Sequence, residues 1–212
     1  MPEILAPGER AQDIARVGDL LANRRLVLFA AAIFLFQLAD ASMLPLIGKH
    51  LAGTSKAGGP IWMSGLIIVP QIIAAMLAPW VGYHSAKKGR RPLLLVGFAL
   101  EPIRAILLAL NGSYAWLVVA QILNGVSGAV IGVLTVLVVT DLTTGTGRFN
   151  LARGAVGAVS GIAASTSTMI TGYLFQGMGL RVSFLAIAAI ACIATAALWL
   201  FLSETKPEHY LD

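Results

Sequence analysis

The sequence predicts an all-α integral membrane protein, built as a bundle of six transmembrane helices. Hydrophobic residues make up 58% of the chain, its mean hydropathy is +0.83, and only 12% of its residues are charged. A water-soluble domain needs more charge to cover its surface, whereas lipid solvates apolar side chains. Several apolar stretches follow one another along the chain, each long enough to cross a hydrocarbon core of about 30 Å.

Composition divides the chain into three parts. Residues 1–24 are polar and mixed in charge, with a short amphipathic pattern that would lie either at the membrane surface or in solvent. Residues 25–206 form the expected membrane domain, and residues 207–212 a cytoplasmic tail. The expected spans are 25–47, 61–83, 92–110, 114–140, 151–175 and 180–202. The fifth is the least apolar, because it is rich in Gly, Ala, Ser and Thr.

Prolines and small residues predict how these spans pack. The first three spans contain Pro45, Pro70, Pro79 and Pro102. Proline removes a backbone hydrogen bond, so we expect bends, and we expect the freed carbonyls to find other partners or a wet cavity. Small residues recur every four positions in the fourth and fifth spans, as at Gly128 and Gly132 and at Gly157 and Gly161. Such faces pack closely against other helices, or form a surface on which helices slide.

The segment Gly82–Arg91, GYHSAKKGRR, predicts the orientation of the chain. It is a short basic connection between two spans, and short cytoplasmic loops are enriched in Lys and Arg. With six spans, its side of the membrane also holds both termini. The basic residues on that side are Arg10, Arg16, Arg24, Arg25, Lys87, Lys88, Arg90, Arg91, Arg148, Arg153 and Lys206, and those on the other side are Lys49, Lys56 and Arg181.

This distribution of charge places both termini in the cytoplasm. It also accounts for the formal net charge of +5 without a nucleic-acid partner, because the basic residues flank spans and do not line one face of a soluble element. Membrane lipid is therefore the first expected partner.

Ionisable and amide side chains inside the spans are the candidate functional residues. A charged residue at the centre of a membrane helix costs roughly 2.5–3.5 kcal/mol on insertion scales, so it usually has a purpose. Asp40 lies one helical turn after Gln37 and has no partner on its own helix; it either binds a proton or a substrate, or lines the break before Pro45. Gln71 and Asn124 are further candidate cavity-lining groups.

Glu101 and Arg104 lie three residues apart in the third span, on one helix face, and are expected to form an intramembrane ion pair. Three interpretations of this pair stay open. It is a local structural ion pair, or it is a substrate or proton site, or Arg104 instead extends its side chain toward the outer membrane interface.

The basic segment resembles a signature of the major facilitator superfamily of transporters. That signature places G-x-x-x-D-R/K-x-G-R-R/K between the second and third spans of a six-helix half. Gly82, Lys87, Gly89, Arg90 and Arg91 match it, whereas Ala86 replaces the acidic residue. The stretches 38–51 and 145–158 resemble the second half of bacterial members, and the polar segment 1–24 resembles the linker between the halves.

The resemblance implies a fold and a function. It implies one six-helix half of a twelve-span transporter, present as a half-length unit, a fragment or a remnant, that moves a small solute by proton-coupled efflux. A second six-helix half or a second copy is the implied partner. The first, second, fourth and fifth spans would line the cavity, and the third and sixth would be peripheral. Asp141 would pair with Arg90 or Arg91 in a cytoplasmic latch.

Two other classes of function are weighed. One is a non-transporting assembly or regulatory subunit in the membrane. The other, more remote, is a rhomboid-like protease, because Gly125–Gly128 reads GVSG on the fourth span. That chemistry needs a histidine base on the sixth span, where none occurs, so we expect Ser127 to be a packing residue and the chain not to be an enzyme. We expect no cofactor and no metal site, since the sequence has no Gly-Lys-Ser/Thr phosphate loop and no Cys/His cluster.

Overall fold

The computed structural model describes residues 18, 22–54, 59–110 and 113–202. Most of the polar segment 1–24, its amphipathic pattern and the tail 207–212 therefore lie outside the described residues. In the described part every regular element is a helix: α2 (Arg24–Asp40), α3 (Met43–Thr54), α4 (Gly59–Lys88), α5 (Arg91–Leu110), α6 (Tyr114–Thr143) and α7 (Phe149–Phe201). The predicted all-helical fold is confirmed.

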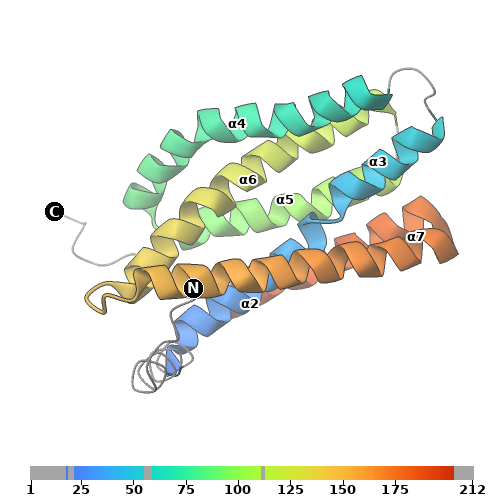
Figure 1. The fold of residues 1–212 in the computed structure, drawn as a ribbon. Coiled ribbons are helices and arrows are strands. Elements are labelled where there is room, and N and C mark those ends of the chain that lie inside the picture. The colour runs from blue at the N-terminus through green and yellow to red at the C-terminus, as the bar shows by residue number, and fades with distance from the viewer. Residues whose placement is uncertain (1–17, 19–21, 55–58, 111–112, 203–212) are drawn as a thin grey trace, which may run out of the picture.

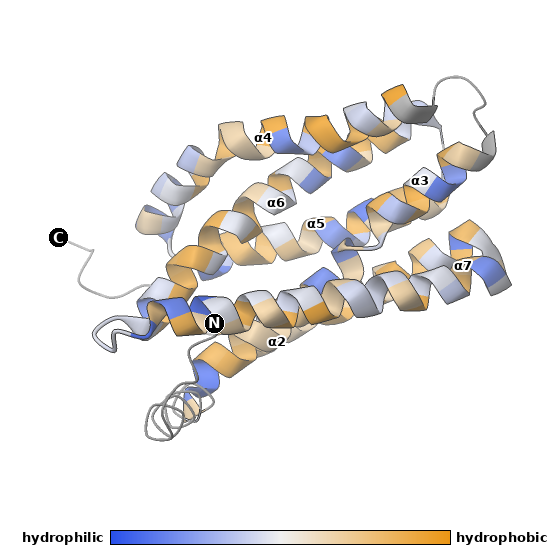
Figure 2. Ribbon diagram, in the orientation of Figure 1, coloured by the Kyte–Doolittle hydropathy of each residue, from blue (hydrophilic) through white to orange (hydrophobic). Residues whose placement is uncertain are grey.

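Among the described residues, five helical stretches are long and apolar enough to cross a membrane, with α2 and α3 together counted as one. Figure 2 shows apolar residues along the whole length of the helices, on outward faces as well as inside. Lipid-facing side chains of this kind are expected where hydrocarbon and not water surrounds the bundle.

The first predicted span is interrupted between α2 and α3. Residues 41 and 42 form a turn, just before Pro45. Because Pro45 has no N–H, the carbonyl of Ala41 loses its usual helical partner, which explains the location of the break. The helix resumes, since the Leu46 N–H donates to Ser42 O at 3.1 Å.

The basic segment is mostly helix and not loop, and the helix continues past residue 83, where the second membrane span is expected to end. Helix α4 continues to Lys88 and ends at Gly89, whose φ of 93° is the left-handed conformation that glycine adopts most easily at a helix end. The exposed Lys87 and Lys88 therefore lie in the last turn, where positive charge favours the helix dipole.

Helix α7 is broken at Gly179, where φ is 81° and ψ is 179°. Figure 1 shows the chain running out along one segment and returning along the other. The contacts agree, because Ala152 in the first segment and Leu198 in the second pack into the same apolar cluster. The two segments correspond to the fifth and sixth expected spans. The sixth crossing itself stays a prediction.

The connections alternate between the two ends of the bundle (Figure 1). The start of α2, the α4–α5 connection, the α6–α7 connection and the end of α7 lie together at one end, which we call the termini end. The end of α5, the start of α6 and the break at Gly179 lie at the other, which we call the distal end. The apolar interior follows the same division. A termini-end core contains Leu26, Leu94 and Leu198, and a distal core contains Ile47 and Phe184.

The prolines inside helices have the predicted consequences in two places. Helix α4, which contains Pro70 and Pro79, curves along its length (Figure 1). In α5, Pro102 cannot donate to the carbonyl of Phe98, and the Thr195 hydroxyl of α7 lies 3.0 Å from that oxygen as a replacement donor. The same hydroxyl lies 2.8 Å from the Ala191 carbonyl of its own helix, so its single hydrogen is shared between the two carbonyls.

Close packing occurs at different glycines from those expected. A Cβ on Gly97 would lie 2.8 Å from Val130 Cγ1, and one on Gly125 would lie 2.6 Å from Ile73 Cβ. By contrast, a Cβ on Gly128 or on Gly157 would meet nothing within 4 Å. The repeated small residues of the fourth and fifth spans are therefore largely open within this chain, because their helix faces point out of the bundle.

Gly125→Ala is expected to destabilise the protein. The added methyl would also lie 2.9 Å from the Pro70 carbonyl oxygen, which is backbone and cannot rotate away. Overpacking of this kind costs about 1–3 kcal/mol, more than the gain of about 1 kcal/mol in helix propensity. Gly128→Ala, one turn along the same helix, is the matched control and should be neutral or stabilising. Thermal unfolding in detergent measures both, and equal midpoints would refute the close contact.

Candidate functional site

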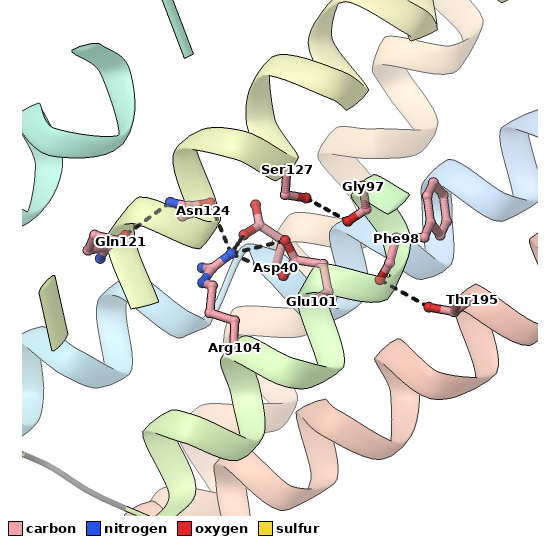
Figure 3. Close-up of polar contacts among 9 residues, drawn as sticks. All are labelled: Asp40, Gly97, Phe98, Glu101, Arg104, Gln121, Asn124, Ser127 and Thr195. Carbon is pink, nitrogen blue, oxygen red and sulfur yellow. Dashed lines mark hydrogen bonds and ion pairs between the residues drawn. The ribbon is translucent and has the colours of Figure 1, made fainter. Parts of the chain in front are cut away.

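One buried guanidinium collects polar groups from three helices (Figure 3). Arg104 Nη1 of α5 lies 2.8 Å from Asp40 Oδ1 at the end of α2, and 2.9 Å from Asn124 Oδ1 of α6. The same nitrogen lies 3.1 and 3.0 Å from the two carboxylate oxygens of Glu101. We call Asp40, Glu101, Arg104 and Asn124 the charged cluster.

The charged cluster lies between the two apolar cores. On α5, Phe98 of the termini-end core precedes Glu101, and Ala105 of the distal core follows Arg104. The flanking core residues on α2 and α6 are Phe36, Ala39, Ala120 and Ala129. The cluster is therefore near mid-height, where charge is most costly in a membrane and where transporters of small solutes place their binding sites.

Burial differs within the cluster. The side chains of Glu101 and Arg104 are each 2% exposed, whereas that of Asp40 is 27% exposed. Asp40 is the carboxylate that the surroundings of the bundle can reach, because it stands at the break between α2 and α3. The predicted Glu101–Arg104 pair is present, and it is not a purely local pair, since Arg104 also holds Asp40.

An amide relay extends the cluster along α6. A guanidinium can only donate, so Asn124 must turn its oxygen toward Arg104 and its nitrogen away. Asn124 Nδ2 then donates to Gln121 Oε1 at 3.1 Å. This leaves Gln121 Nε2 as a donor, buried and without a hydrogen-bond partner among the described residues. Gln121 was missed by sequence reasoning, although its position three residues before Asn124 places both on one helix face.

Two other predicted site residues are not part of the cluster. Gln37 is half-buried one turn before Asp40, and Gln71 is exposed on α4. In the described part of the chain no side-chain hydrogen bond joins either of them to Asp40, Glu101, Arg104 or Asn124. Their roles in binding stay predictions.

The two arginines of the basic segment contact two different helix ends. Arg90 Nε lies 3.1 Å from Asp141 Oδ2 near the end of α6, with both side chains 8% exposed. Arg91 instead donates through Nη2 to the Trp199 carbonyl at 2.7 Å, near the end of α7. Of the two pairings that the resemblance left open for Asp141, the structure contains the one with Arg90. That this pair acts as a latch stays a proposal.

A buried serine supports the Arg90 contact. Ser85 Oγ accepts a hydrogen bond from Arg90 Nη1 at 3.0 Å and donates to the Gly82 carbonyl at 2.9 Å. Sequence reasoning missed Ser85, whose only signal was its place inside the basic segment. Lys87 extends outward, and its Nζ lies 4.4 Å from the centre of the Tyr83 ring.

Ser127 has a packing contact. It is fully buried, and its hydroxyl donates to the Gly97 carbonyl of α5 at 2.9 Å. This contact lies beside the close approach of Gly97 to Val130, so Ser127 joins α5 to α6. In the described residues, no group of three or more His, Cys, Asp or Glu side chains is arranged to hold a metal ion.

Comparison with known families identifies the fold. The model of the Major Facilitator Superfamily matches residues 29–211. The chain belongs to the Major Facilitator Superfamily. This family consists of membrane transporters, and it confirms the resemblance carried by the basic segment.

Several curated relatives share this family. An uncharacterised MFS-type transporter of Mycobacterium tuberculosis is 39% identical over 186 residues, which cover 88% of this chain and 44% of that protein. The class B tetracycline resistance protein of Escherichia coli is 30% identical over 51% of this chain and 26% of its own length. The multidrug resistance protein MdtG of Proteus mirabilis is 27% identical over 76% of this chain and 40% of its own length.

A solved structure has the same fold. The human organic anion transporter MFSD10 (TETRAN) superposes with a TM-score of 0.66 at 22% identity, over 88% of this chain and 49% of that one. This chain therefore spans less than half the length of each of these relatives.

Proposed function

We propose that this chain is one six-helix half of a secondary active transporter that moves a small solute out of a bacterial cell, coupled to protons. It would lie in the inner (plasma) membrane with both termini in the cytoplasm, which is the orientation that the basic residues favour. A second six-helix half, or a second copy of the chain, would complete the transport path.

The charged cluster carries this proposal. Two carboxylates and a guanidinium at mid-height are costly to bury, and the hydrogen-bond partner that α6 supplies to Arg104 is the neutral amide of Asn124. With every group ionised the cluster has a net charge of −1, so one proton or one monovalent cation neutralises it. Asp40, the more exposed of the two carboxylates, is the group that would take up and release that cation.

The names of the relatives favour efflux. The tetracycline and multidrug resistance proteins are similar to this chain over a quarter to two fifths of their own length. The open faces of the bundle support the proposal of a second unit. Only 11% of the most apolar stretch of α4 is buried, and the small-residue face of α7 has open space at Gly157 and Gly161. Such faces allow close approach of another helix in lipid.

In this mechanism the two six-helix units rock about the central site and expose it to each side in turn. The Arg90–Asp141 pair holds α6 to the α4–α5 connection at the termini end while that side is closed. A non-transporting membrane subunit would have no need of a partly exposed carboxylate inside the charged cluster.

Asp40→Asn is expected to abolish the dependence of solute flux on a pH gradient. The purified chain and its second unit are reconstituted into lipid vesicles that are loaded with a fluorescent cationic dye. Efflux of the dye is followed with the external buffer at acid or at neutral pH. The matched control is Asp13→Asn, which removes a carboxylate from the polar N-terminal segment. Unchanged flux and an unchanged pH profile in Asp40→Asn would remove Asp40 from the mechanism. Absence of dye flux in the wild-type assembly would favour the alternative function, a non-transporting membrane subunit.

A further inference from the structure

We propose that Arg104 is a positioning residue that converts a proton on Asp40 into a loosening of α2 from α5 and α6. This inference rests on the proposed proton coupling and adds a route for it within this chain. The third span would then not be peripheral to transport.

The first observation is that one nitrogen serves too many acceptors. Arg104 Nη1 has two hydrogens, yet four oxygens from Asp40, Glu101 and Asn124 lie between 2.8 and 3.1 Å from it. Meanwhile Arg104 Nε is buried with no hydrogen-bond partner among the described residues. The carboxylates of Asp40 and Glu101 therefore compete for the two hydrogens of Arg104 Nη1. A change in the charge of one carboxylate alters the strength of the hydrogen bonds that Arg104 donates to the other.

The second observation is that no other charge can take the place of Arg104. Its own helix contributes Glu101, and the only charged residue of α6 is Asp141, which pairs with Arg90 at the termini end. The charged residues of the remaining neighbours stand toward the two ends of the bundle. Lys49 and His50 of α3 and Arg181, beside the break at Gly179, lie toward the distal end, and Arg153, near the start of α7, lies toward the termini end. Asp40 is also the only acidic residue of α2.

The third observation concerns what holds α2 in place. Helix α2 packs mainly along α7 and touches α5 and α6 at few places. One of these is the contact of Phe36 with Phe98, whose ring centres lie 5.0 Å apart. Asn23 Nδ2 donates to the Leu142 carbonyl of α6 at 3.3 Å at the termini end, so the Asp40–Arg104 ion pair is the polar attachment at the opposite end of α2.

A proton on Asp40 changes this attachment. A neutral carboxyl accepts a weaker hydrogen bond than a carboxylate, so the guanidinium turns fully to Glu101, three residues away on its own helix. Asn124, held by Gln121, keeps Arg104 against α6 in both states. The end of α2, already broken before Pro45, is then released from α5 and α6, while α5 and α6 stay joined.

Spin labels on α2 and α5 test this inference without any transport measurement. Cys192, the single cysteine, is replaced by serine, and cysteines are placed at Ala41, the C-cap of α2 beside Asp40, and at Ile103 of α5, which is 50% exposed. The distance between the labels is measured in lipid nanodiscs along an acid-to-neutral titration. The wild-type background should show a reversible lengthening or broadening of the distance at acid pH.

The variants give separate outcomes. Asp40→Asn should hold the acid-pH distance throughout, because the amide mimics the protonated carboxyl. Glu101→Gln should hold the neutral-pH distance, because Arg104 then has no second carboxylate to turn to. Arg104→Lys keeps the charge but loses the planar fork that reaches three helices, so its pH response should be lost while the chain stays folded. Arg181→Lys on α7 is the control and should respond like the wild type.

A distance that is independent of pH in the wild type, or a pH response that survives in Arg104→Lys, would overturn the role of Arg104. Failure of the proposed transport gives a different result. A pH-dependent distance without solute flux would leave the coupling through Arg104 standing and remove only the transport of that solute.

Discussion

Arg104→Met is expected to be the most destabilising single substitution in the charged cluster. It removes the cation from two carboxylates, of which Glu101 is 2% exposed, and leaves Asn124 without its donor. Breaking a buried ion pair by deleting one partner costs about 3–5 kcal/mol, because the remaining charge stays buried and unpaired. Unfolding of the detergent-solubilised protein, followed by helical circular dichroism, measures the loss.

The physical cause is tested by removing the orphaned charges. Arg104→Met combined with Asp40→Asn and Glu101→Gln should recover much of the lost free energy of unfolding, since no unpaired charge is left inside. Arg181→Met, at an exposed position on α7, serves as the control for loss of a positive charge and should change little. If the triple variant is as unstable as Arg104→Met, packing of the arginine and not charge pairing is responsible.

Arg90→Met is expected to have the second largest effect, of about 3 kcal/mol in the free energy of unfolding. Arg90 faces Asp141 at 3.1 Å, and Asp141 is 8% exposed, so the carboxylate would be left buried without a counter-charge. The same change should open the termini end of the bundle. Val81 at this end is 1% exposed. In the Cys192→Ser background, the cysteine of Val81→Cys should therefore react faster with a maleimide when Arg90→Met is present than when it is absent.

Lys88→Met is the matched control, because it removes a positive charge two residues away from an exposed side chain. A double-mutant cycle with Asp141→Leu separates the pair from each residue's other contacts. A coupling energy near zero, or equal reaction rates at Val81→Cys in Arg90→Met and Lys88→Met, would contradict a latch at this place.

Element positions could be predicted well, and element ends less well. The span at 92–110 matches α5 to within one residue, because an uninterrupted apolar run leaves few alternatives. The second span was predicted to end at residue 83, yet α4 runs to Lys88. Polar residues continue a helix as readily as apolar ones, so hydropathy locates the membrane boundary and not the end of the helix. Gly89, with its positive φ, sets that end.

Candidate site residues could be proposed singly but not assembled. Asp40, Glu101, Arg104 and Asn124 each stood out as polar groups in apolar runs, whereas Gln71 stood out equally and lies exposed on α4. The small-residue pattern likewise pointed to Gly128, whereas the close approach is at Gly125. Periodicity marks a helix face, and it does not say which neighbour that face meets.

The sequence by itself determined that this chain is a membrane protein, where its apolar helices lie and which family it belongs to. These properties depend on local composition and on short motifs, so they can be predicted without knowing which distant residues are in contact. Only the tertiary structure decided that Asp40 meets Arg104, which lies 64 positions further along the chain. A charge in an apolar helix must find its partner across the bundle, and helix packing alone selects that partner.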